Sequence, residues 1–138
     1  MAATVSATIE SGFGPAAPGK GARIADCGIR ILLALAFVAA GVAKLAGAPP
    51  MVAIFDQIGI GQWFRLLTGM LEIAGGLLVL VPRSSAWGAL LLLCVMAAAV
   101  FTHLVVIGGN PVPALVLLVL SAAVLWLRRR QPLAAIGR

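Results

Sequence analysis

Ionisable side chains inside apolar segments are the residues of this sequence best suited to chemistry. Glu72 lies near the middle of an apolar run, with Gly69, Gly75 and Gly76 three and four residues from it. In a helix these positions share one face, and glycines on that face let another helix approach closely. A charge in the middle of a membrane costs about 2.5–3.5 kcal/mol, so such residues pair or face a polar cavity. We therefore expect Glu72 to point at a neighbouring helix, where it can bind a proton or a polar ligand group.

Four other residues can lie near Glu72 if their helices turn the right faces inward. Lys44 ends one apolar span, His103 lies about one turn inside the end of another, and Met96 is seven residues before His103. Arg65 is seven residues before Glu72 on roughly the same face. At a rise of ~1.5 Å per residue, these depths allow convergence in one half of a helical bundle. The predicted polar pocket comprises Lys44, Glu72, His103, Met96 and Arg65, and a purely structural pairing of Glu72 with Lys44 or His103 is the alternative.

The remaining polar residues of the spans favour structural roles. Asp26 and Arg30 are spaced i, i+4 with the acid first, which predicts an ion pair at the end of a helix. Cys27 and Cys94 are 67 positions apart and form no C-x-x-C motif, so we expect two packed thiols, no dithiol centre and no metal site.

The composition identifies the elements that must position these residues. The chain has 138 residues, enough for one domain, and 62% of them are hydrophobic while only 10% are charged. Soluble proteins average roughly 45–50% apolar and about 25% charged residues, so an integral membrane protein is predicted. The net charge of +6 comes from basic residues outside the apolar spans. It therefore indicates orientation in the membrane and contact with anionic headgroups, and no nucleic-acid partner is expected.

Hydropathy and turn residues divide the chain into an all-α arrangement. Residues 1–21 are predicted to be a disordered tail, residues 22–130 a membrane domain and residues 131–138 a second tail. The domain should hold four transmembrane helices, at about residues 24–45, 63–81, 86–107 and 113–127. Met51, Ile54, Phe55 and Ile58 follow a helical period between the first two spans. They predict a short amphipathic helix on the outer surface, beginning near Pro49-Pro50 and ending at Gly59.

The distribution of cations predicts the topology. With four spans, the N-terminal tail, the turn at Pro82 and the C-terminus share one side, and most lysines and arginines outside the spans are on that side. The positive-inside rule then places both termini in the cytoplasm. Short connections between successive spans favour an antiparallel four-helix bundle.

At these positions the sequence resembles the DoxX family of small bacterial four-helix membrane proteins, in particular its DoxX-like branch. The matching features are Arg30 with Phe37-x-x-x-Gly41-x-x-Lys44, the Gly69-x-x-Glu72-x-x-Gly75-Gly76 run, Met96 with Ala99 and His103, and Asn110-Pro111. The resemblance covers about residues 29–127 and implies a multi-pass bundle in the bacterial cytoplasmic membrane. It also implies a link to redox metabolism, because relatives include a membrane subunit of a thiosulfate:quinone oxidoreductase.

Three functions are compatible with these observations. The first is a redox-linked membrane subunit whose polar pocket, in the outer half of the bundle, binds a quinone or a small sulfur compound. Such a chain would be at most a subunit of an oxidoreductase, with electrons passing to or from a soluble or membrane partner protein. The second is a non-enzymatic scaffold that recruits partners through the Arg128-Arg129-Arg130 run or the outer helix. The third is a proton or small-solute carrier, disfavoured because the spans lack an inverted repeat and a continuous polar stripe.

Overall fold

The computed structural model describes residues 18–130, and every regular element within that range is helical. The helices are α2 (Lys20–Leu45), α3 (Pro49–Ile58), α4 (Gln62–Leu80), α5 (Ser85–Phe101) and α6 (Val112–Arg128), and the π-helical turn η1 (Thr102–Val106) continues α5. Residues 1–17 of the predicted N-terminal tail and the whole predicted C-terminal tail lie outside the described residues.

The helix bounds follow the predicted spans with two differences. α2 begins at Lys20, so Lys20 and Gly21 belong to the helix and not to the predicted tail. Arg23 donates its backbone N–H to the carbonyl of Gly19, which closes the first turn. The third predicted span is α-helical only to Phe101, and its last turn is the π-helix η1. The short connecting helix α3 has prolines at its first two positions and ends at Gly59 in the left-handed conformation, as its turn residues predict.

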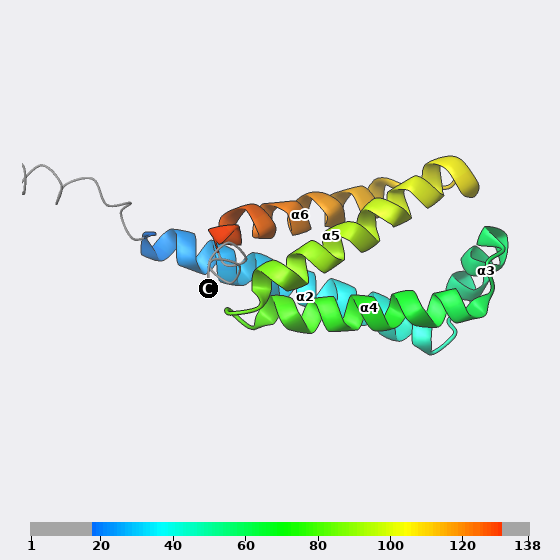
Figure 1. Ribbon diagram of the computed structural model, residues 1–138, viewed down its shortest axis with the longest axis horizontal. Coiled ribbons are helices and arrows are strands. Elements are labelled where there is room, and N and C mark those ends of the chain that lie inside the picture. The colour runs from blue at the N-terminus through cyan, green and yellow to red at the C-terminus, as the bar shows by residue number, and fades with distance from the viewer. Residues whose placement is uncertain (1–17, 131–138) are drawn as a thin grey trace, which may run out of the picture.

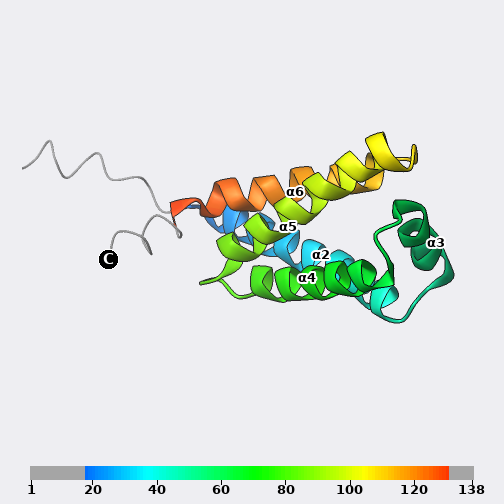
Figure 2. The same cartoon turned by 45° about the vertical axis from the view of Figure 1, so that its right-hand side comes forward.

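The long helices pack as two antiparallel pairs. α2 lies along α4, α5 lies along α6, and α4 joins the pairs by packing on α5. Figures 1 and 2 show that the start of α2, the α4–α5 turn and the end of α6 lie together at one end of the molecule. The two pairs separate toward the opposite end, where α3 lies beside α4. Lys44, Arg65 and His103, three of the predicted pocket residues, belong to the helix ends on this wider side of the bundle.

Apolar side chains and glycines hold the helices together in the narrower half. Leu33, Phe37, Val79, Leu92 and Val124 are almost fully buried between the four long helices. The outward surfaces are also apolar, with many exposed leucines and valines. Among the described residues, three helical segments are long and apolar enough to cross a membrane: Lys20–Leu45, Gln62–Leu80 and Ser85–Val106. α6 is apolar but has only 17 residues.

Candidate functional site: a pocket beside a buried ion pair

A buried ion pair joins α2 to α4. Lys44 Nζ lies 3.0 Å from Oε1 and 2.8 Å from Oε2 of Glu72, so the ammonium group donates to both carboxylate oxygens. The Glu72 side chain is 3% exposed and that of Lys44 is 14% exposed. Because both charges are nearly removed from solvent, each depends on the other for its polar contacts.

Glycines on both helices allow this pairing. A Cβ atom added to Gly69 would lie 3.0 Å from the carbonyl oxygen of Gly41 and 3.1 Å from Cβ of Lys44. A Cβ atom on Gly41 would lie only 2.6 Å from the carbonyl oxygen of Gly69. The backbones of α2 and α4 are therefore in direct contact one turn before the two charged residues. Gly75 and Gly76, on the same face of α4 as Glu72, are buried against α5 and α2 respectively.

The ion pair borders a pocket of about 260 Å³ in the wider half of the bundle. Its lining is mostly apolar, and the polar side chains in it are Lys44, Thr68, Glu72, Thr102 and His103. Both threonine hydroxyls bond to backbone carbonyls of their own helix, one turn earlier. The hydroxyl protons are therefore engaged, and Lys44, Glu72 and His103 are the ionisable groups that line the pocket. A mostly apolar cavity with a few convergent polar groups is the usual form of a small-molecule site.

His103 faces this pocket from the π-helical turn. The backbone N–H of Ile107 bonds to the carbonyl of Thr102, which is the i→i−5 bond of a π-helix. His103 Nδ1 is buried and has no hydrogen-bond partner among the described residues. The sequence contained no recognisable signal for the π-helical turn. Such turns occur frequently at functional sites.

Helix α3 covers the pocket at its wide end. Met51, Ile54, Phe55 and Ile58 line the pocket, and Phe55 is 6% exposed. The Phe55 ring contacts the Phe64 ring edge-on, with centroids 5.8 Å apart. Gln62 Nε2 donates to the carbonyl of Val52 at 3.1 Å and to Asp56 Oδ1 at 2.6 Å. These contacts tie α3 to the start of α4, so the predicted amphipathic helix also forms a wall of the pocket.

The structure places three of the four expected neighbours of Glu72 around the same pocket. Lys44, Met96 and His103 line it together with Glu72. Arg65 does not line the pocket, and its Nε donates to Gln62 Oε1. Its Nη1 is buried beside Gly47 without a hydrogen-bond partner among residues 18–130. Arg65 therefore borders the α2–α3 connection, and the partner of Glu72 is Lys44.

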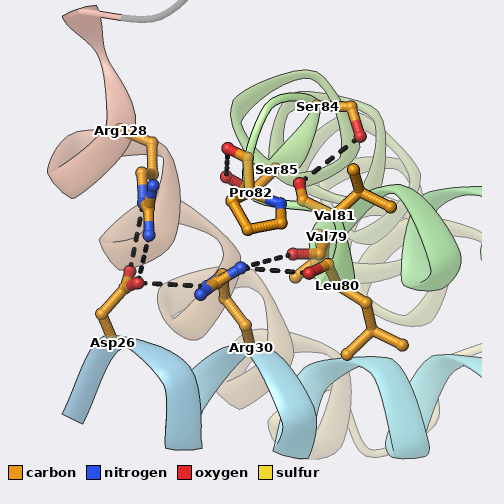
Figure 3. Close-up of polar contacts among 9 residues, drawn as sticks. All are labelled: Asp26, Arg30, Val79, Leu80, Val81, Pro82, Ser84, Ser85 and Arg128. Atoms are coloured by element: carbon orange, nitrogen blue, oxygen red, sulfur yellow. Dashed lines mark hydrogen bonds and ion pairs between the residues drawn. The ribbon is translucent and has the colours of Figure 1, made fainter. Parts of the chain in front are cut away.

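A second polar cluster lies at the narrow end (Figure 3). Arg30 Nε lies 3.1 Å from Asp26 Oδ2, so these two residues form the ion pair that their i, i+4 spacing predicts. Arg30 Nη1 also donates to the carbonyls of Val79, at 3.4 Å, and Leu80, at 3.2 Å, at the end of α4. Arg128 from α6 binds the same aspartate. The cluster joins α2, α4 and α6. The sequence did not predict that Arg128 pairs with Asp26, because residues 102 positions apart share no local pattern.

The fold and the two polar clusters define a small multi-pass helical membrane protein with a pocket between its helices. The chain belongs to the DoxX-like family, whose family model matches residues 29–127. The resemblance seen in the sequence is thereby confirmed. Comparisons with curated proteins and with solved structures gave no match.

Proposed function

We propose that this DoxX-like protein is a redox-linked membrane subunit that binds a quinone in the pocket beside Lys44 and Glu72. The observation that carries the proposal is the buried ion pair at the edge of an apolar cavity that also holds His103. A quinone has a flat apolar ring and two carbonyl oxygens that accept hydrogen bonds. The apolar lining suits the ring, while the Lys44 ammonium group and the His103 imidazole can donate to the oxygens.

The same residues favour a neutral ligand over an anionic sulfur compound. The positive charge of Lys44 is already balanced by both oxygens of Glu72. An anion such as thiosulfate would bring two further negative charges beside Glu72 in a site with low exposure to water. Like charges in such a place repel strongly. We therefore rank quinone first and a small sulfur compound second among the ligands to test.

Reduction of a quinone to a quinol consumes two electrons and two protons. Glu72 and His103 are side chains of the types that exchange protons with a bound ligand. Among residues 18–130, no three His, Cys, Asp or Glu side chains lie together as a metal site would require. We propose that the electrons come from a partner protein, soluble or in the membrane, that docks on this subunit.

We propose that the bundle lies in the bacterial inner membrane, with four spanning helices and both termini in the cytoplasm. The support is the charge distribution along the bundle. Lys20, Arg23, Arg83, Arg129 and Arg130 all belong to the end where α2 begins. By the positive-inside rule that end faces the cytoplasm, so the pocket opens in the outer half of the membrane.

The test measures quinone binding to the purified protein in mild detergent. We expect a short-chain quinone to raise the melting temperature, since a ligand at 100 times its Kd stabilises the native state by about 2.7 kcal/mol. Ala99→Leu adds bulk to the pocket lining without changing a charge and should abolish the rise. Ala97→Leu is the matched control, because Ala97 is exposed on the same helix and does not line the pocket.

Thiosulfate is tested in parallel. A melting temperature that rises with thiosulfate and not with quinone would assign the pocket to a sulfur compound. If neither ligand changes the melting temperature, the pocket does not bind these ligands. The same conclusion follows if quinone raises the melting temperature of Ala99→Leu as much as that of Ala97→Leu. The scaffold function would then be favoured.

A further inference from the structure

Five exposed cations at the narrow end of the bundle have no ion-pair partner among the described residues. They come from three separate segments: Lys20 and Arg23 in α2, Arg83 in the α4–α5 turn, and Arg129 and Arg130 at the end of α6. Figures 1 and 2 show these three segments at the same end of the molecule. The positive charge at this end therefore comes from segments that are distant in sequence and adjacent in the fold, and not from a single basic run.

The one acid near these cations cannot neutralise them. Asp26 is the acidic residue at this end within residues 18–130, and its carboxylate is shared between Arg30 and Arg128. The cluster drawn in Figure 3 therefore has two arginines for one aspartate and is itself positive. At the opposite end the charges balance, because Lys44 pairs with Glu72, and Arg65 and Asp56 are the other two charged residues there.

Tryptophan side chains lie among the cations. Trp126 is 68% exposed, and the guanidinium carbon of Arg129 lies 4.0 Å from the centroid of its ring. Trp87, two residues after the start of α5, is 43% exposed. Exposed tryptophans next to apolar helices are typical of the level of lipid headgroups, and stacking on Trp126 holds the Arg129 charge at that level.

We propose that this basic end is a binding surface for the phosphate groups of anionic phospholipids. A lipid surface fits better than a nucleic acid because apolar, exposed helix faces begin directly beside the cations. A lipid can place its phosphate against the arginines and its chains along those faces. Each lysine or arginine near an anionic membrane surface contributes about 1 kcal/mol, which is about a fivefold change in affinity. The inference is independent of what the pocket binds.

Tryptophan fluorescence tests this surface directly. The protein is reconstituted with brominated phosphatidylglycerol or brominated phosphatidylcholine, whose bromines quench a tryptophan that they contact. Trp63→Phe leaves Trp87 and Trp126, which report on the basic end. Trp87→Phe/Trp126→Phe leaves Trp63, which lies at the start of α4 at the opposite end. We expect phosphatidylglycerol to be preferred at the basic end only, and the preference to fall with added salt because exposed charges are screened.

Charge removal provides the decisive comparison. Arg129→Gln/Arg130→Gln, made in the Trp63→Phe background, should reduce the preference by about fivefold for each arginine. Arg65→Gln removes one cation at the opposite end and should leave it unchanged. The proposal is overturned if both lipids quench equally at the basic end, if the preference is the same at both ends, or if the double variant keeps it. Equal losses in the Arg65→Gln and double variants would also overturn it.

Discussion

Removing one member of the Lys44–Glu72 pair should destabilise the protein more than removing both. At the 2.8 Å separation of Nζ and Oε2, an effective dielectric constant of about 20 gives an attraction of about 6 kcal/mol. Desolvation of the two groups offsets part of this attraction. Breaking a buried pair costs about 3–5 kcal/mol because one charge remains without a partner. We expect Glu72→Gln at the lower end of that range, because the Lys44 side chain is 14% exposed and can extend toward water. Lys44→Met should fall at the upper end, because Glu72 is 3% exposed and cannot move out.

The assay is a double-mutant cycle in mixed detergent micelles. Unfolding is driven by a denaturing detergent and followed by circular dichroism for wild type, Lys44→Met, Glu72→Gln and the double variant. The double variant carries no buried charge at this position and should be more stable than either single variant. Lys20→Gln is the control, because Lys20 is exposed, has no ion-pair partner among the described residues and should contribute less than about 0.5 kcal/mol. Additive losses in the double variant would refute the reasoning, since they would mean that the two charges do not stabilise each other.

Two further predictions concern helix packing and the narrow end. Gly41→Ala places a Cβ atom 2.6 Å from a backbone oxygen of α4 and should cost about 1–3 kcal/mol of unfolding free energy. Gly28→Ala is the control, because a Cβ atom there has no neighbour within 4 Å, and it should be neutral or slightly stabilising. Equal effects in the same detergent assay would contradict the close approach of α2 and α4. Asp26→Asn should lower stability by about 3–5 kcal/mol, because it leaves the buried Arg30 without its carboxylate. Arg128→Gln should cost about 1 kcal/mol, because its side chain is 25% exposed. A larger loss in Arg128→Gln than in Asp26→Asn would show that the aspartate is not the centre of that cluster.

Local patterns in the sequence were sufficient to predict most of the helical elements. The apolar runs, Pro49-Pro50 and Gly59 predicted the positions of the helices to within a few residues, because helix formation and termination depend on neighbouring residues. The spacing of Gly69, Glu72, Gly75 and Gly76 predicted one buried face of α4, and all four are buried. Depth along each helix also follows from counting residues. This is why Lys44, Glu72, Met96 and His103 could be expected in the same half of the bundle before their helices were placed.

The sequence alone determined a membrane-type helical protein of the DoxX-like family, with an acid that had to face another helix. Only the tertiary structure decided which partners the charged residues have. Glu72 could pair with Lys44, Arg65 or His103 by depth, and the contact of Gly41 with Gly69 selected Lys44. The placement of α3 over the pocket, the π-helical turn at His103 and the Asp26–Arg128 pair depend on how helices distant in sequence pack. The physical reason is that helix periodicity fixes the face and depth of a side chain, while its partner is fixed by packing between helices.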